Sequence, residues 1–483
     1  MQEEVKSPVG EKPDRDKLIY PMQQTANGIM SSFFATYLNS LMTMIYVFPI
    51  SVAGAVEGLS QVIGWIAEPL SGVMMDRFSF KKAKYWPWII IGSIGMAICW
   101  IIVYTLPVFL KNPQAWAIPV AIIIILQQFL AGPNANVGHT LYARIAMDGK
   151  LRSYLAMWGK IGRDGMKVIV GLVFPLMLTG LLAFGMEEVK VWAIIAIILA
   201  GASIALQSIT VILTKNSRVE KEALAGRAAV KKQPRPISKT VKVILSNRAL
   251  LVAFMAQALS KVFFFYHIMG GMFLWRYYMQ NMGLLAAFMT LISLSAITGA
   301  SCVPVVYRLL KDTKRCAVMT YIMQIAMYGI AYFVMSPGNP WGTIVIICAA
   351  QFFNGMSDSF LQPLFAHGAD YSAWKSGNKD YGLNMSVFGL AIMTGALLST
   401  ISRTAILAGG GFNSAALTPA AMAAGAVVPE GVMAALHNLN TLYPLMLCAV
   451  ITLVLVFIYP LNDRKVEEIQ KEIAARDAAA MKT

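Results

Sequence analysis

The sequence predicts an all-α polytopic membrane protein with twelve transmembrane helices in two bundles of six. The first observation is composition: mean hydropathy is +0.62 and only 13% of the residues are charged, where a soluble domain carries about 25%. The second is a series of apolar runs of about 20 residues or more, each long enough to cross the hydrocarbon core as a helix. These runs lack the alternating pattern of a membrane β-barrel. The third is the distribution of basic residues between the runs.

The apolar runs define the twelve spans and the domain boundaries. The spans are predicted at 20–47, 52–76, 87–110, 116–142, 153–184, 189–214, 249–279, 283–310, 316–336, 341–367, 380–408 and 439–460. The domains that follow are an N-terminal tail (1–19), a six-helix bundle (20–214), a basic central loop (215–248), a second bundle (249–460) and a tail (461–483). The last tail has the spacing of an amphipathic helix, with Val466, Ile469 and Ile473 on one face, and we expect it to be solvated or interfacial.

Basic residues predict the orientation. Of the 40 Lys and Arg residues, 35 lie in alternate connections and in the two tails, and only Lys111 and Lys190 lie clearly in the others. Positive charge accumulates on the cytoplasmic side of a membrane, so we expect a multi-pass protein of the inner membrane with both termini in the cytoplasm. This placement also explains the net charge of +16 without a nucleic-acid partner.

Several classes of function are poorly supported. The chain has no Walker loop, no HExxH motif and no membrane-compatible pair of nucleophile and base, which argues against an enzyme or an ATP-driven pump. It has no repeated filter sequence of a channel, and its five cysteines form no metal or disulfide pattern. No signal-peptide pattern precedes the first span. We therefore expect no metal or cofactor, and as partners a small-molecule substrate and the lipid bilayer, with the protein a monomer.

A basic loop after the second span carries the first motif, Gly72-Val-Met-Met-Asp76-Arg77-Phe-Ser-Phe-Lys81-Lys82. It resembles the GxxxDRxxxRK signature of the major facilitator superfamily, which implies that fold and a cytoplasmic gate built from Gly72, Asp76, Arg77 and Lys81. A weaker copy, Tyr307-Arg308-Leu-Leu-Lys311-Asp312, follows the eighth span. The same feature at the same place in each half indicates duplicated bundles.

A second set of segments narrows the resemblance. The run Ala67-Glu68-Pro69-Leu-Ser-Gly72, the run Lys84-Tyr85-Trp86-Pro87-Trp88-Ile89-Ile90 and the segment Ala369-Asp370-Tyr371-Ser-Ala-Trp374-Lys375-Ser-Gly377 occur in this order. Together they resemble the glycoside–pentoside–hexuronide:cation symporter family. The resemblance implies cation-coupled transport of a glycoside-like solute, and it adds Asp370 and Tyr371 to the inner gate.

The chain departs from that family at charged positions of the cation and sugar site. The acidic residue before proline is kept as Glu68, but the other acidic residue of the same helix falls on Gly64, the one on helix 4 near Ala131, and the lysine of helix 11 near Met393. Sodium prefers a cage of several oxygen ligands, whereas a proton needs one carboxylate. The coupling ion is therefore expected to be H⁺ rather than Na⁺, and uncoupled transport stays open.

Charges inside the spans each require a reason, because a charged side chain at the bilayer centre costs at least about 2.5 kcal/mol. Glu68 lies about eight residues, or roughly 12 Å, from the inner end of its span, and Asp358 and Lys261 lie at similar depth in the second half. We predict Glu68 and Asp358 as coupling carboxylates. The alternatives are a structural carboxyl at Glu68 and a Lys261–Asp358 salt bridge that only packs two helices.

Polar and aromatic residues on the spans are candidates for substrate binding. They are Gln127, Gln128, Asn134, Lys160, Arg163, Lys261, Tyr266, Trp275 and Asn354. The sequence leaves open whether Lys160 or Arg163 faces the cavity, and whether the aromatic side chains only pack. Arg403 is expected to snorkel to the outer surface, and Arg276 with Tyr277 and Tyr278 is expected to form an outer interface belt.

Three hypotheses follow. The first is a secondary active transporter that works by alternating access and takes up a glycoside-like solute with a proton. The second is a divergent carrier of a more apolar or anionic solute, such as a lysolipid or an organic acid, with or without a coupling ion. The third is a membrane receptor or sensor derived from a transporter, against which the kept gate loop 72–82 argues.

Overall fold

The computed structural model describes residues 15–77, 80, 83–145, 149–225, 247–376 and 381–480, and within these ranges the regular structure is helical. The helices of the first half are α1 (Asp16–Met30), α2 (Thr36–Ser40), α3 (Ile50–Arg77), α4 (Trp86–Thr105), α5 (Ala117–Ile145), α6 (Gly149–Ala183), α7 (Glu188–Asn216) and α8 (Arg218–Ala225). Those of the second half are α10 (Arg248–Phe273), α11 (Leu285–Ser301), α12 (Val303–Leu310), α13 (Thr313–Val334), α14 (Pro340–Ser376), α15 (Tyr381–Gly409), α16 (Pro419–Ala423), α17 (Glu430–Asn440), α18 (Leu442–Leu453) and α19 (Asp463–Ala480).

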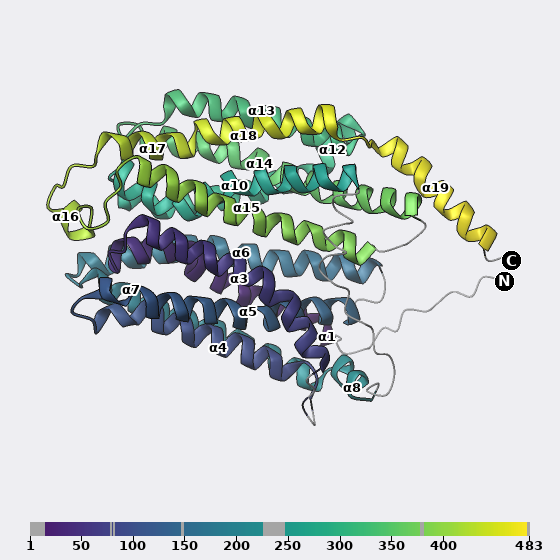
Figure 1. Ribbon diagram of the computed structural model, residues 1–483, viewed down its shortest axis with the longest axis horizontal. Coiled ribbons are helices and arrows are strands. Elements are labelled where there is room, and N and C mark those ends of the chain that lie inside the picture. The colour runs from purple at the N-terminus through teal and green to yellow at the C-terminus, as the bar shows by residue number, and fades with distance from the viewer. Residues whose placement is uncertain are drawn as a thin grey trace.

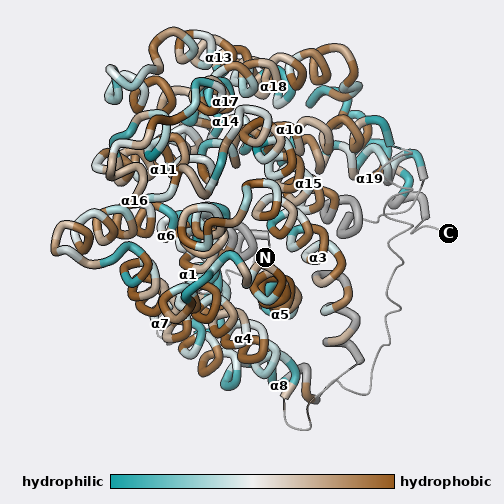
Figure 2. The backbone as a smooth tube through the Cα atoms, turned by 60° about the vertical axis from the view of Figure 1, so that its left-hand side comes forward, coloured by the Kyte–Doolittle hydropathy of each residue, from teal (hydrophilic) through white to brown (hydrophobic). Residues whose placement is uncertain are grey.

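The predicted spans correspond to these helices. Eleven segments of the described chain are long and apolar enough to cross a membrane, and apolar residues dominate the spanning helices in Figure 2. The predicted first span differs from the others because π-helical turns at Ser31–Ala35 and Leu41–Ile45 divide it into α1 and α2. With this divided helix, the described chain supplies the twelve spans that the sequence predicts.

The helices form two bundles that lie side by side (Figure 1). In the first bundle α1 packs on α6 and α7, and α5 packs on α3 and α4. In the second, α14 packs on α11 and α13, and α15 packs on α10. The bundles meet where α3 contacts α15 and where α6 contacts α11. α8 and α19 lie at one end of the molecule and α16 lies at the other (Figure 1), here called the terminal side and the outer side.

Glycine permits the closest helix approach in the second bundle. A Cβ atom added to Gly355 of α14 would overlap the carbonyl oxygen of Ala296 on α11, and one added to Gly299 would overlap that of Phe352. The two glycines thus face each other's helix backbones. Small residues at such positions let membrane helices pack through their backbones, which explains why α11 and α14 share one of the most extensive contacts of the fold.

A repeated contact on the terminal side supports the duplicated design. In the first half the carboxylate of Glu220, on α8, accepts a hydrogen bond from the backbone N–H of Tyr85 at 3.0 Å, just before α4. In the second half the carboxylate of Asp463, on α19, accepts one from the N–H of Thr313 at 3.1 Å, at the start of α13. In each half, an acidic residue after the sixth span caps the third span, where unpaired N–H groups need acceptors.

The C-terminal helix is docked on the second bundle, which corrects the expectation of a solvated or interfacial tail. Val466 and Ile469 of α19 are buried, and the helix packs along α14. The Nε2 of Gln470 donates to Asp370 at 2.8 Å, and Arg476 donates to the carbonyl oxygen of Trp374 at 2.7 Å. The predicted amphipathic face is therefore the packing face.

Candidate functional site

The structure brings Lys261 and Asp358 together in the middle of the second bundle. Lys261, on α10, lies 2.6 Å from Oδ1 of Asp358 on α14, and the Nε2 of Gln257 donates to the same oxygen at 3.0 Å. The Lys261 ammonium also lies over the ring of Phe264, 4.9 Å from its centroid. The Lys261 side chain is 9% exposed and that of Asp358 is 33% exposed. The carboxylate is therefore accessible although it is held in an ion pair.

Further charges lie on α6 of the other bundle. Lys167 is 2.9 Å from Asp164, and Arg163 is 4.0 Å from the same carboxylate. The Arg163 side chain is 50% exposed and that of Lys167 is 37% exposed. Because exposed charges on spanning helices are unfavourable in hydrocarbon, these side chains require a water-filled space. These three residues form a charged region on α6, the helix that contacts α11 of the second bundle.

Several other candidates are engaged in packing within one bundle in this state. Asn134 accepts a hydrogen bond from Gln23 at 2.9 Å and donates to Asn27 at 2.8 Å, which joins α5 to α1. Asn354 is buried and lies 3.5 Å from the Oε1 of Gln324 on α13.

The remaining substrate candidates lie on α5 and on the helix that begins as α10. Gln127 is buried on α5, while Gln128 lies against Gly64 of α3. Trp275 is fully buried beside the ring of Phe288. The Tyr266 hydroxyl is 2.6 Å from the Ser402 hydroxyl of α15, so it links two helices of the second bundle. A substrate role for any of these side chains stays a prediction.

The predicted gate residues that the structure describes lie at the terminal side. Gly72, Asp76 and Arg77 belong to the last turns of α3. Lys81 and the side chains of Glu68, Asp76, Arg77 and Lys160 fall outside what the structure describes. Asp370 accepts its hydrogen bond from α19, and the ring of Tyr371 lies 5.8 Å from that of Trp374. Of these two residues of α14, Asp370 is thus in direct contact with the C-terminal helix.

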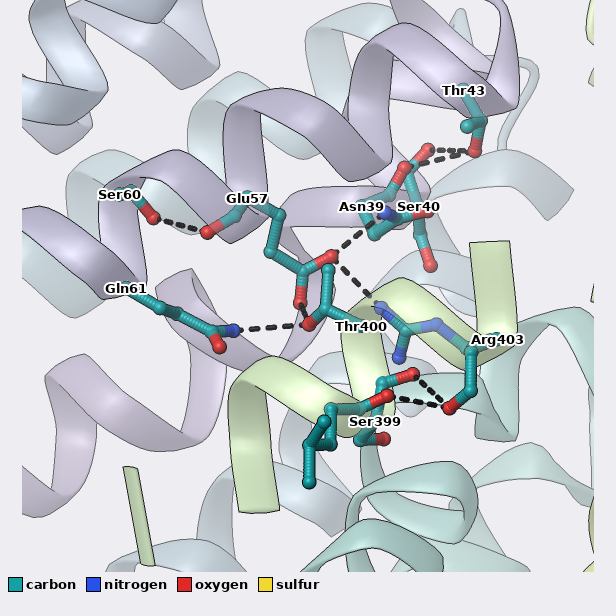
Figure 3. A network of polar contacts seen from close by, with 11 residues as sticks. Asn39, Ser40, Thr43, Glu57, Ser60, Gln61, Ser399, Thr400 and Arg403 are labelled. Carbon is teal, nitrogen blue, oxygen red and sulfur yellow. Dashed lines mark hydrogen bonds and ion pairs between the residues drawn. The ribbon is translucent and has the colours of Figure 1, made fainter. Parts of the chain in front are cut away.

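The structure also reveals a buried polar network that the sequence did not indicate (Figure 3). Nη2 of Arg403, on α15, lies 2.8 Å from Oε2 of Glu57 on α3. Asn39 of α2 donates to Oε2 at 2.7 Å, and the Thr400 hydroxyl donates to Oε1 at 3.0 Å. Gln61 in turn donates to Thr400 at 3.0 Å. We call Asn39, Glu57, Gln61, Thr400 and Arg403 the outer network.

The outer network joins the two bundles. Glu57 lies near the start of α3 and Arg403 near the end of α15, so the pair is on the outer side. Glu57 is 4% exposed and Arg403 is 1% exposed, which corrects the expectation that Arg403 snorkels to the surface. Removing one partner of a buried ion pair leaves an uncompensated charge and costs about 3–5 kcal/mol.

A second ion pair joins the bundles nearby. Arg276, at the end of the helix that begins as α10, lies 2.6 Å from Glu188 at the start of α7. Tyr277 and Tyr278 are buried and donate to the carbonyl oxygens of Leu417 and Met335. The expected interface belt is therefore wrong, because all three side chains face protein. Among the described residues, both ion pairs between the bundles close the outer side.

Two six-helix bundles that meet on one side and carry charges between them define a membrane transporter of the major facilitator fold, not an enzyme. The family model described as MFS/sugar transport protein matches residues 19–463, so the chain belongs to that family. Solved structures share the fold. A nucleoside transporter, NupG, superimposes with a TM-score of 0.61 at 16% identity, covering 91% of this chain and 99% of its own. A D-xylose–proton symporter gives 0.61 at 9% identity, covering 92% and 98%.

Relatives by sequence extend over nearly the whole chain. YjmB of Bacillus subtilis (strain 168), an uncharacterised symporter, is 24% identical over 468 residues, covering 95% of each chain. YagG of Escherichia coli (strain K12), provisionally named a glycoside/cation symporter, is 23% identical over 474 residues, covering 96% of each. These relatives agree with the family resemblance drawn from the motifs of the sequence.

Proposed function

We propose that the protein is a secondary active symporter of the inner membrane that takes up a glycoside-like organic solute with a proton by alternating access. The observation that carries this proposal is the outer network. A carboxylate and a guanidinium that are both buried at the contact between bundles form a closed gate, since they must separate for solute to enter from the outer side. The terminal side, which we infer to be cytoplasmic, then serves for release.

Proton coupling is assigned to Asp358 and Glu68. Asp358 is accessible and holds Lys261, so its protonation would weaken the ion pair and free the Lys261 ammonium. Glu68 lies on α3, the helix that also carries Glu57 of the outer network. A proton on Glu68 would thus act on a helix that lies at the contact between the bundles. The glycoside-like solute rests on the family and on the name of one relative.

Replacing Glu68 with glutamine tests the coupling assignment. Because the amide cannot take up a proton, Glu68→Gln is expected to lose accumulation of solute against a gradient while it keeps solute exchange. The measurement is uptake into proteoliposomes of radiolabelled melibiose, methyl glucuronide and xylose, at varied pH and sodium, with counterflow as the readout of exchange. Full concentrative uptake by Glu68→Gln would remove Glu68 from the coupling site.

An anionic solute is the second candidate, and Arg163 is the observation that favours it. Asp358 is paired with Lys261, and Asp164 is paired with Lys167. The half-exposed guanidinium of Arg163 lies 4.0 Å from Asp164, which is farther than the cation in either of those pairs. Arginine matches a carboxylate in a bidentate geometry. If the glucuronide is transported and Arg163→Gln raises its KM without affecting a neutral sugar, the anionic reading replaces the neutral one.

A further inference from the structure

A groove on the terminal side of the second bundle lies away from the region between the bundles. Its volume is about 500 Å³. It runs between the start of α13 and the segment 456–462 that precedes α19. The lining residues that matter here are Asp312, Lys314, Arg315, Val318, Ile322 and Val456.

The deeper part of the groove is apolar and faces outward from the bundle. Val318 and Ile322 lie on α13, with Val456 on the opposite wall. Ile322 is 50% exposed and Val456 is 41% exposed. Ile322 is nine residues after Thr313, the first residue of α13, so this wall extends roughly 13 Å into the span. Exposed aliphatic side chains at that depth on a spanning helix are in contact with hydrocarbon.

The mouth of the groove is cationic. The Lys314 ammonium donates to the carbonyl oxygens of Val456 and Tyr459, at 3.2 and 2.9 Å, which leaves one of its three N–H groups free. Arg315 is exposed, and its side chain forms no ion pair or hydrogen bond with any residue that the structure describes. Asp312 also lines the mouth, but its two oxygens accept the backbone N–H groups of Arg315 and Asp463.

We propose that this groove binds one anionic phospholipid of the leaflet on the terminal side. The lipid phosphate lies between Arg315 and Lys314, and an acyl chain covers Val318, Ile322 and Val456. A free phosphate would satisfy the two cations but would leave the apolar wall without an occupant. Clustered basic residues at the membrane surface attract anionic headgroups, and here an apolar channel continues from them.

The test is native mass spectrometry of the full-length protein, delipidated in detergent and titrated with phosphatidylglycerol. Arg315→Gln is expected to reduce the fraction of singly lipid-bound protein by about fivefold, the effect of one basic residue at a membrane surface. Arg308→Gln is the matched control, because Arg308 is also an exposed arginine on the terminal side but does not line the groove. Val318→Trp, which fills the apolar part of the groove and keeps both cations, is expected to lose phosphatidylglycerol binding as well.

Four outcomes would overturn the proposal. The first is equal loss in Arg315→Gln and Arg308→Gln, which would indicate general surface attraction. The second is binding of phosphatidylcholine as tight as that of phosphatidylglycerol, with the binding of both lipids unchanged in Arg315→Gln. The third is competition by glycerophosphoglycerol, which lacks acyl chains, at the same concentration as the lipid. The fourth is unchanged lipid binding by Val318→Trp. Selective loss in Arg315→Gln and Val318→Trp alone supports the lipid site.

Discussion

Replacing Arg403 with glutamine is expected to open the outer side of the protein. The substitution leaves the buried Glu57 side chain at the contact between the bundles without its cation, with Asn39 and Thr400 as its remaining donors. Separation of the bundles lets water reach the carboxylate and relieves a penalty of about 3–5 kcal/mol. Since each 1.4 kcal/mol changes an equilibrium about tenfold, the population with an open outer side should rise by at least about tenfold.

Cysteine labelling measures this opening. Thr404 of α15 packs against Gly54 of α3 across the bundle contact, so Thr404→Cys in a cysteine-free background reports on access from outside. A membrane-impermeant maleimide, applied to right-side-out vesicles at alkaline pH, should react at least about tenfold faster in Arg403→Gln. The double variant Glu57→Gln with Arg403→Gln has no uncompensated charge and should react more slowly than the single one. Equal labelling rates in Thr404→Cys alone, with Arg403→Gln added, and with both Glu57→Gln and Arg403→Gln added would show that the outer network is not a gate.

Asp358→Asn is expected to abolish concentrative uptake and to preserve exchange. The amide removes the titratable group that Lys261 holds at 2.6 Å, so a proton gradient can no longer act on that ion pair. Counterflow needs only binding and the rocking of the bundles, and it should continue. The expected loss of accumulation is more than about tenfold, which corresponds to a loss of more than about 1.4 kcal/mol of coupling free energy. The measurement is uptake into proteoliposomes under an imposed pH gradient.

A double-mutant cycle separates coupling from helix packing. Lys261→Ala leaves Asp358 without its cation, whereas Lys261→Ala with Asp358→Asn leaves neither charge. If the pair only packs α10 on α14, the double variant should recover both stability and accumulation. If the pair couples transport, the double variant should recover stability and remain uncoupled. Unchanged accumulation in both single variants would rule out a functional role for the pair.

Features that depend on local sequence were predictable. Span positions follow from apolar runs, and the docking face of α19 follows from the spacing of Val466, Ile469 and Ile473. The proximity of Lys261 and Asp358 was predictable because equal depth in the membrane leaves few partners for two opposite charges. The amphipathic pattern did not reveal that α19 docks on protein, since a membrane surface and α14 can both cover an apolar helix face.

Features that depend on how the bundles meet were not predictable from one sequence. Glu57 and Arg403 are 346 residues apart, and the sequence around either residue does not identify the other as its ion-pair partner. Arg403 is near the end of its span, where a long cation normally reaches water. The expectation for Arg276 was wrong for a different reason: the tyrosines beside it are typical of a membrane interface. The contact with α7 and α3 turns both cations inward instead.

Cross-linking of the outer contact tests alternating access most directly. A Cβ atom at Gly54 would lie 2.7 Å from the Cβ atom of Thr404. The Cβ atoms of a disulfide are about 3.8 Å apart, so Gly54→Cys with Thr404→Cys should form a cross-link once α3 and α15 move apart by about 1 Å. The oxidised protein should show no solute uptake or counterflow in proteoliposomes, and a reductant should restore both. Undiminished transport by the fully cross-linked protein would contradict the central claim that the outer contact opens in every cycle.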